Sequence, residues 1–517
     1  MKKDKIFKAT FIIMIVTLLS KVLGMVRDLL VGNIFGVSAY TDAYKAAVTI
    51  PDTIFTIIGL GISTVFIPML SKVRYEKNKS EMFSFANNII SLLSLASIVL
   101  FLLGIIYTEN IVKVFVVGFD RERLDLAVFL TRISLINLLF LSINACFSAM
   151  LQVCEDFIIP SILGIFFNAP IIIYLLLFNS VNIYGLTIAN VLGNLFRVIV
   201  QLPSLYKHGY RLRLHINLKD ERIKKIFVLL IPVMIGSGAN SLNMVVDTNV
   251  ASTLSKGSMS IVDYAQKIIT FANTAFTTSI VSVMYPLMAN KLSEGDKKGF
   301  INYLNKSLVS IGLLLVPVAA GFIILSREII EVFYGWGNSF TQKDIYLTSI
   351  ALLGYGLSIP FIGIRDILNS SLFSMQKTKI TAFNGIIGVA VNITLSISLA
   401  RKFGVFGIAV ASSTAAMTIA ILLLISIRKE IGSFEIKPFV IKFMKIVASA
   451  FIMCGVLAAF NKAFMLNDSI DKKIIIMKII LDGILGAGVY FICCKLFKIE
   501  ELEQFITLLR NRKGNED

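Results

Sequence analysis

The sequence has few charged residues. Only 16% of its 517 residues are charged, whereas 56% are hydrophobic and the mean hydropathy is +0.82. A soluble globular protein is closer to a quarter charged, so this composition excludes a large soluble domain and indicates an integral membrane protein. The net charge of +18 is then typical of cytoplasmic loops rich in Lys and Arg, and it is not by itself evidence for a nucleic-acid partner.

Side chains that build enzyme and metal sites are also scarce. The five cysteines lie in or beside apolar stretches without CxxC spacing, a pattern that favours free thiols over disulfides or a metal site. The chain contains no GxxxxGK[ST], HExxH or GxSxG motif. The loop at 108–123, with Glu109, Asp120 and Glu122, is thin support for a lipid-linked glycosyltransferase or phosphatase. We therefore expect a transporter, not an enzyme.

Long apolar runs fill most of the chain. A helix needs about 20 apolar residues to cross a bilayer, and about 14 segments of this sequence meet that length without barrel-type alternation. The predicted spans are 8–32, 41–70, 82–107, 124–153, 157–178, 183–206, 225–251, 259–289, 302–326, 345–375, 379–400, 405–427, 440–461 and 474–496. This pattern predicts an all-α integral membrane protein.

Alternate loops carry most of the Lys and Arg, which predicts that these loops and both termini are cytoplasmic. The sequence also contains a weak internal repeat. LGMVRDLLV at 23–31 resembles LNMVVDTNV at 242–250, which aligns Asp28 with Asp247. At nearly the same offset, Gln152, Gly164 and Asn168 align with Gln376, Gly388 and Asn392.

The repeat predicts the domain organisation. Because an even number of helices separates the two copies, they have the same orientation and are related by an axis along the membrane normal. We predict two parallel six-helix lobes at 1–206 and 225–428, joined by a basic cytoplasmic linker at 207–224. Two further helices at 440–496 and a cytoplasmic tail at 497–517 complete the chain.

Charged residues within the predicted spans concentrate in helices that the repeat relates. Intramembrane charges almost always face a bundle interior or a water-filled cavity, so we expect them to line a hydrated cavity between the lobes. An excess of Lys and Arg would suit an anionic substrate such as a phosphate or a carboxylate. The predicted substrate-binding residues are Lys21, Arg27, Asp28, Asp42, Lys45, Lys267 and Arg365.

A structural role stays open for several of these residues. Arg27 and Asp28 are adjacent on a helix, so we expect them to point apart and to find separate partners in ion pairs that join helices. Asp42 lies near the start of its helix and could cap it. Arg132 and Arg197 could snorkel or form structural pairs.

Several stretches resemble the lipid II flippase family (MurJ, formerly MviN), within the multidrug/oligosaccharidyl-lipid/polysaccharide exporter superfamily. They are SKVLGMVRD at 20–28, TDAY at 41–44, FIP at 66–68, VVDTNV at 245–250 and FYG at 333–335. The resemblance implies alternating access that moves undecaprenyl-linked peptidoglycan precursor from the cytoplasmic to the outer face of the bacterial plasma membrane. It also implies that the helices at 440–496 hold the lipid tail and that cell-wall synthesis enzymes are candidate partners.

The resemblance implies a sodium site formed by Asp247, Asn392, the carbonyl of Ile408 and Ser412. Carboxylate, amide and hydroxyl oxygens suit a hard cation such as Na⁺, and the membrane potential is the alternative driving force.

The chain departs from the family pattern at several positions. Lys replaces the usual Arg at 21 and 267, which keeps the charge but loses bidentate geometry. Phe55, Leu60, Ser370 and Ser396 occupy positions where the family usually has charged residues. Three alternatives therefore stay open: a flippase for another undecaprenyl-diphosphate-linked oligosaccharide, a cation-coupled drug exporter, and a scaffold for cell-wall enzymes.

Overall fold

The computed structural model describes residues 2–61, 65–178, 180–224, 226, 243, 245–432, 436–463 and 472–502, and its account of side chains omits residues 2–12, 57–61, 278, 279 and 282. The described chain consists of helices and connecting turns, without a strand among the described residues. It divides into two compact units, Met1–Ser260 and Ile261–Asp517. This boundary lies beyond the predicted linker at 207–224, because residues 245–260 pack with the first unit.

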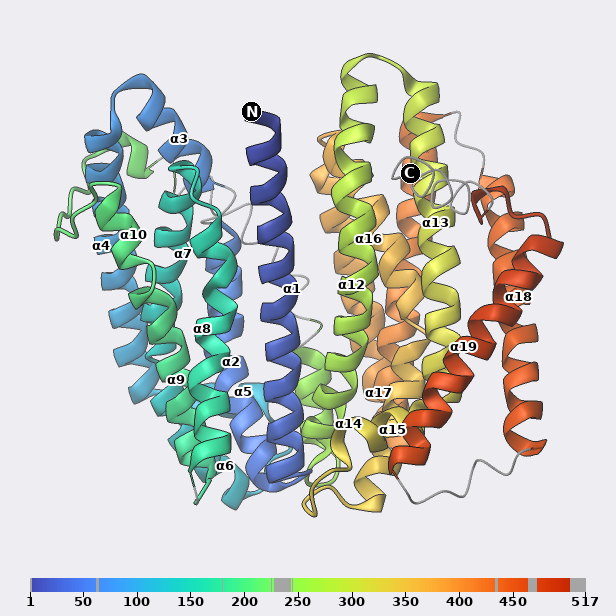
Figure 1. The fold of residues 1–517 in the computed structure, drawn as a ribbon. Helices are drawn as coiled ribbons and strands as arrows, with labels where there is room; N and C mark the ends of the chain where they lie inside the picture. Colours follow the sequence, from blue (N-terminus) through green and yellow to red (C-terminus); the bar gives the residue numbers. More distant parts are fainter. Residues whose placement is uncertain are drawn as a thin grey trace. The chain divides into compact units, whose positions relative to one another are not determined.

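The first unit contains the N-terminal helices in chain order (Figure 1). They are α1 (Lys2–Phe35), α2 (Ala39–Gly61), α3 (Ile67–Glu76), α4 (Lys79–Ile106), α5 (Thr108–Phe115), α6 (Arg121–Ser134), α7 (Asn137–Val153), α8 (Ile158–Leu177), α9 (Ile183–Ile199) and α10 (Leu202–Lys207). Helix α1 packs along α8, α8 along α9, and α2 along α6. Most of the predicted span at 225–251 lies outside the described residues.

The second unit contains most of α12 (Ser258–Ser293) and the helices that follow it (Figure 1). They are α13 (Lys297–Ile324), α14 (Ser326–Tyr334), α15 (Gln342–Gly356), α16 (Ile359–Ser374), α17 (Thr378–Ile431), α18 (Ile436–Ala463) and α19 (Lys472–Leu496). Helix α13 packs against both α16 and α18, and α18 packs along α19.

Helix α17 contains the two predicted spans 379–400 and 405–427. Its 54 residues would extend roughly 80 Å as one straight helix, far beyond a hydrocarbon core of about 30 Å. Gly404 interrupts it with φ 57° and ψ −136°, a backbone conformation that glycine adopts without a Cβ clash. The two arms then pair, because Asn384 Nδ2 donates to Ser426 Oγ over 3.0 Å. The segment is therefore a helical hairpin with two spans.

The helices have the length and composition of membrane spans. Within the described residues, eight helical segments are long and apolar enough to cross a bilayer, and α15 with α16, bent by 41°, forms a ninth candidate. The predicted count of about 14 counts α17 as two spans and includes residues outside the described chain, so it stays a prediction. The all-α membrane architecture is confirmed.

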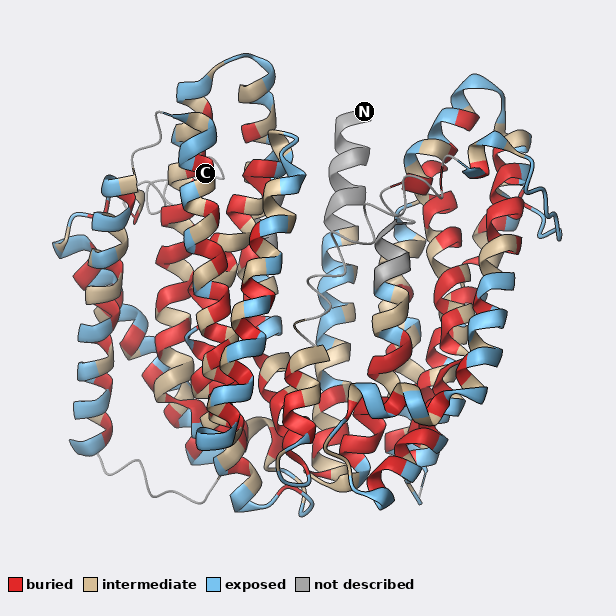
Figure 2. Cartoon of the chain, turned by 180° about the vertical axis from the view of Figure 1, so that it is seen from behind, coloured by how far each residue is buried: buried red, intermediate tan, exposed pale blue. Residues whose placement is uncertain are grey.

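Exposed residues lie on the outward faces of many helices in each unit (Figure 2). Many of them are large and apolar, including Leu177, which is 74% exposed, and Phe451, which is 73% exposed. Large exposed apolar surfaces are unusual in soluble monomers and are expected where the surrounding solvent is lipid.

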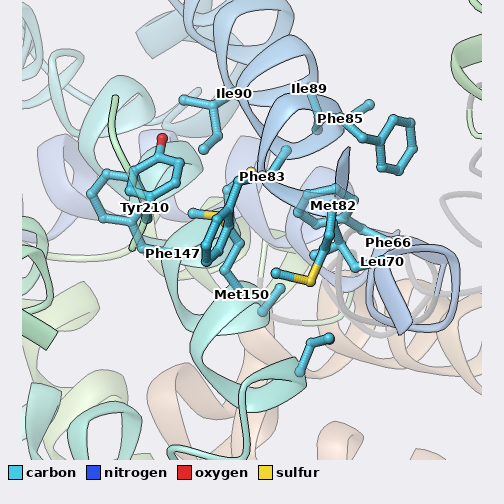
Figure 3. Packing of buried hydrophobic residues seen from close by; sticks show 14 of the residues in the cluster. Phe66, Leu70, Met82, Phe83, Phe85, Ile89, Ile90, Phe147, Met150 and Tyr210 are labelled. Atoms are coloured by element: carbon cyan, nitrogen blue, oxygen red, sulfur yellow. The ribbon is translucent and has the colours of Figure 1, made fainter. Parts of the chain in front are cut away.

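A buried apolar cluster in the first unit joins α3, α4 and α7 to the segment after α10. Phe83 and Phe147 pack edge-on against Tyr210, with ring centroids 5.4 and 5.9 Å away (Figure 3). The Tyr210 hydroxyl donates to Asn87 Oδ1 over 2.7 Å, and Asn88 Nδ2 donates to the Asn217 carbonyl over 3.0 Å. The linker predicted at 207–224 is therefore docked along α4.

Candidate functional site

Arg27 and Asp28 of α1 bind each other. The Nε and Nη2 atoms of Arg27 both donate to Asp28 Oδ1, over 3.1 and 2.9 Å. The prediction that these neighbours point apart was wrong, because the long arginine side chain folds back along the helix and its fork of donors reaches the adjacent carboxylate. Both side chains are mostly buried, at 18% and 11% exposed.

A second arginine joins this pair through an aromatic ring. The guanidinium carbon of Arg27 lies 5.2 Å from the centroid of Phe167 in α8, and that of Arg197 in α9 lies 4.0 Å from the same centroid. Both distances are typical of cation–π contacts. Asp52 of α2 interacts electrostatically with Arg197 and Arg27. We call these five residues, Arg27, Asp28, Asp52, Phe167 and Arg197, the arginine cluster.

Arg197 was not among the predicted substrate-binding residues, because a lone arginine near the end of an apolar helix usually snorkels. The sequence feature that could have indicated the position of Arg197 is Gly193, one turn earlier in α9. A Cβ at Gly193 would lie 2.5 Å from the Phe167 carbonyl oxygen, so only glycine lets α9 approach α8 this closely. That close approach brings Arg197 against the ring.

Small and polar residues also hold α1 against α8. A Cβ at Gly164 would lie 2.1 Å from Ser20 Oγ. Asn168 Nδ2 is 3.4 Å from the Ser20 carbonyl oxygen and donates to the Gly164 carbonyl over 2.8 Å. Gly164 and Asn168 are repeat positions, and here they fix the helix that carries Arg27. Lys21 is exposed on the same helix, whereas Lys45 is buried in α2.

Asp42 makes a buried connection across the first unit. Its Oδ2 accepts from the Gly257 backbone over 2.6 Å, and its Oδ1 accepts from the Ser260 backbone over 2.9 Å and from Ser260 Oγ over 2.8 Å. Arg123 Nη1 lies 3.8 Å from the same carboxylate. Asp42 therefore caps the start of α12 instead of its own helix, and its role in substrate binding stays a prediction.

The loop before α6 strengthens this connection. Asp120 Oδ1 accepts from Arg123 Nε over 2.9 Å, and Lys256 Nζ lies 3.1 Å from Asp120 Oδ2. These contacts, with the Arg123 hydrogen bond the larger cause, lower the pKa of Asp120 to about 2. The Gly118 backbone donates to Ser252 Oγ over 3.1 Å. Residues 252–260 are thereby fixed to the first unit.

In the second unit, predicted residues pair within single helices. Arg365 of α16 donates from Nε and Nη2 to Asp366 Oδ1 over 3.1 and 3.0 Å. Lys267 Nζ lies 3.2 Å from Asp263 Oδ2 one turn earlier in α12. Ser370, where the family resemblance leads one to expect arginine, is buried and donates to the Asp366 carbonyl over 2.8 Å.

The residues of the predicted sodium site belong to different units. Asp247 is buried in the first unit, and Asn392, Ile408 and Ser412 lie on α17 in the second. Asn392 Oδ1 accepts a hydrogen bond from Ser396 Oγ over 2.6 Å, so the serine at the family's second aspartate position orients the amide. The site itself stays a prediction.

An apolar groove of about 560 Å³ lies between α8 and α9. Its walls include Phe166 and Pro170 of α8 and Ile188 and Phe196 of α9. The predicted lipid-tail helices, α18 and α19, instead contain a buried polar group around Asp482. The assignment of the tail to these two helices stays a prediction.

Known proteins share this sequence and this fold. The family described as "Lipid II flippase MurJ" matches residues 31–475. A probable lipid II flippase MurJ from Aquifex aeolicus is 30% identical over 387 residues, which cover 74% of this chain and 75% of the relative. A solved structure titled "Lipid II flippase MurJ, inward closed conformation" is 28% identical, with a TM-score of 0.81, and covers 94% of this chain and 98% of that one.

A more distant likeness shows the fold alone. An inward-facing multidrug resistance MATE family transporter of the MOP superfamily is 13% identical, with a TM-score of 0.70, and covers 80% of this chain and 95% of that one. The family match spans most of the chain, including α8 and α9, which carry Phe167 and Arg197. The chain therefore belongs to the lipid II flippase MurJ family.

Proposed function

We propose that this chain moves lipid II from the cytoplasmic to the outer face of the bacterial plasma membrane by alternating access, with the arginine cluster binding the diphosphate. Family membership supports the substrate class and makes the chain a transporter, not an enzyme. The observation that carries the assignment of the site is the convergence of Arg27 and Arg197 on Phe167 inside apolar helices. Intramembrane arginines are costly, and their presence marks a functional site.

The geometry suits a diphosphate. A guanidinium group stacked on a ring still presents its edge for bidentate hydrogen bonds to phosphate oxygens. Two guanidinium groups on one aromatic ring provide two adjacent phosphate-binding groups, one for each phosphate of a diphosphate. Asp28 fixes the orientation of Arg27, and a bound diphosphate would compete with Asp52 for both arginines.

The driving force is also part of the proposal. The oxygen atoms of Asp247, Asn392, Ile408 and Ser412 are of the type that Na⁺ prefers, and the membrane potential is the alternative. The distribution of Lys and Arg supports cytoplasmic N- and C-termini. Cell-wall synthesis enzymes are the proposed protein partners, because they consume the exposed substrate.

Complementation tests the function. A bacterial host depleted of its own lipid II flippase is supplied with this chain, and lipid II on the outer face is measured. We expect exposure to be restored by the wild type and by Arg401→Ala, which removes an exposed arginine at the α17 turn. Arg27→Ala should lose it at equal membrane expression.

Failure of the well-expressed wild type would overturn lipid II as the substrate and favour another lipid-linked glycan. Restored exposure with a fully active Arg27→Ala variant would instead overturn the site and leave the substrate standing.

A further inference from the structure

Helices α14, α18 and α19 enclose a group of polar side chains that the proposed transport function does not use. Lys478 and Asp482 lie one turn apart on α19 and are only 3% and 1% exposed. Lys478 Nζ pairs with Glu328 of α14. Asn461 near the end of α18 is 5% exposed and donates from Nδ2 to Asp482 Oδ2 over 3.0 Å.

Two oxygen atoms in this group lack a hydrogen-bond partner. Asp482 Oδ1 and Asn461 Oδ1 are both buried, and neither has a partner within the described part of the chain. A buried polar atom without a partner carries a desolvation cost, so each requires an explanation. The two atoms belong to the same pair of side chains, which indicates one missing donor.

The charges of the buried group also indicate that a positive charge is missing at Asp482. Among the described residues, the charges that act on Asp482 are those of Lys478 and Glu328. With all three groups ionised, one cation faces two carboxylates, and the buried group carries an excess negative charge. Because Lys478 already pairs with Glu328, the excess resides on Asp482. A buried carboxylate without a paired cation becomes neutral by binding a proton.

We infer that Asp482 and Asn461 form a proton-binding site, in which a proton on Asp482 Oδ1 is donated to Asn461 Oδ1. A protonated carboxyl group has one donor, and a primary amide has both a donor and an acceptor. The acid and the amide then pair through two parallel hydrogen bonds, and one proton satisfies both unpartnered oxygens. The ligand is the proton itself, and the site joins α18 to α19.

Neighbouring groups favour a proton over a metal cation. The ammonium group of Lys478 lies one turn from Asp482 on the same helix and opposes any added positive charge, so a single proton on one oxygen is favoured over a divalent metal cation. Of the other helices packed against α19, α14 contributes Glu328, α18 contributes the amide of Asn461, and α13 contributes the Leu313 carbonyl, which accepts from the Tyr490 hydroxyl over 2.9 Å. Loss of the proton would leave both acceptor oxygens buried without a donor among the described residues.

Infrared difference spectroscopy on the purified full chain tests this inference. We expect the wild type at neutral pH to show a C=O stretch from a protonated carboxyl group, and Asp482→Asn to lose it. Asp366→Asn is the matched control, because that carboxylate already binds Arg365 and should contribute no such band. A protonated-carboxyl region that is identical in the wild type and Asp482→Asn would overturn the site.

Thermal unfolding provides a second measurement that does not depend on the band. Asparagine at 482 can make both hydrogen bonds to Asn461 without a proton, so Asp482→Asn should lack the pH dependence that the bound proton gives the wild type. The wild-type midpoint should fall relative to that of Asp482→Asn as the pH rises from about 4, the ordinary value of an aspartate, until the folded chain has lost the proton. Asp482→Leu should be lower at every pH. Equal pH dependence of the wild type and Asp482→Asn would overturn the inference.

Discussion

The two units each contain an Arg–Asp pair at adjacent helical positions, and the two pairs have nearly the same geometry. In α1 the Nη2–Oδ1 distance between Arg27 and Asp28 is 2.9 Å, and in α16 the distance between Arg365 and Asp366 is 3.0 Å. The surroundings differ, because Arg27 also meets Phe167, which Arg197 contacts from α9. Among the described residues, no aromatic ring lies in cation–π contact with Arg365. The local pair is common to both units, whereas the arginine cluster belongs to the first.

The second contrast concerns two aspartates, each of which lies early in the second predicted span of its lobe, 41–70 or 259–289. Asp42 of α2 accepts hydrogen bonds from Gly257 and Ser260, more than 200 residues away in sequence. Asp263 of α12 forms an ion pair with Lys267, one turn along the same helix. A repeat in sequence thus keeps the residue type while tertiary packing gives it a different partner. In the first unit, Asp42 joins α2 to the start of α12.

We expect the greatest difference in lipid II flipping between substitutions in the two Arg–Asp pairs. Arg27→Ala should abolish lipid II flipping, because it removes one of two phosphate anchors and leaves Asp28 without that partner. Arg365→Ala should reduce flipping less, since no second stacked arginine accompanies it. The measurement is outer-face lipid II in the complemented host at matched expression. Equal loss of flipping in both variants would show that the second stacked arginine does not distinguish the Arg27 pair from the Arg365 pair.

The next difference concerns the free energy of unfolding, which should fall more when Asp42 is replaced than when Asp263 is replaced. Asp42→Ala should lower the free energy of unfolding by about 3 kcal/mol, because it leaves buried backbone donors without an acceptor. Asp263→Ala should cost about 1 kcal/mol or less, as expected for a partly exposed ion pair within one helix. Thermal unfolding of the purified full chain measures both. Asp42→Asn, which keeps one acceptor oxygen, should lie between Asp42→Ala and the wild type.

A smaller effect sharpens the role of the shared ring. Phe167→Leu keeps an apolar side chain and removes a cation–π contact worth about 1 kcal/mol, so substrate affinity should fall about five-fold. Phe166→Leu is the matched control, because this neighbour lines the apolar groove instead. Binding of a diphosphate-bearing lipid to the purified variants checks the difference. Equal affinities would show that Phe167 does not orient the arginines.

The smallest effect is a dependence of stability on acid. The pKa of Asp120 is lowered to about 2 in the folded chain, so its contribution is complete above its ordinary value near 4. That contribution should disappear as the pH falls from about 4 to about 2. Because the group is largely exposed, we expect about 1 kcal/mol or less. Asp120→Asn should flatten this part of the pH profile of the unfolding midpoint.

Periodicity and run length predicted most helices well. The span expected at 82–107 corresponds to α4 (Lys79–Ile106), and the spans at 440–461 and 474–496 correspond to α18 and α19. Length alone fixes such helices, because a lipid-facing segment must satisfy its own backbone hydrogen bonds. The span expected at 183–206 corresponds to the candidate span Ile183–Lys207, within which α9 ends at Ile199 and α10 starts at Leu202, just before Pro203.

The candidate site was less predictable than the helices. Arg27 and Asp28 stood out because charge within an apolar run is unusual, but their mutual contact was not expected. Arg197 was passed over, because nothing local distinguishes a snorkelling arginine from one that stacks on a distant ring. The polar group around Asp482 could not be inferred from the sequence, since its partners lie on α14 and α18.

Composition and run length are enough to identify a helical membrane protein with charged residues at a few intramembrane positions, and the sequence motifs indicate the family. Those properties depend on composition and on spacings within one or two helical turns. Helix packing selects the contacts of the charged residues: Arg27 and Arg197 share Phe167, Asp42 binds the start of α12, and Asp482 binds Asn461. The physical reason is that a buried charge must find a partner, and the distances that select it are set by helix packing rather than by position along the chain.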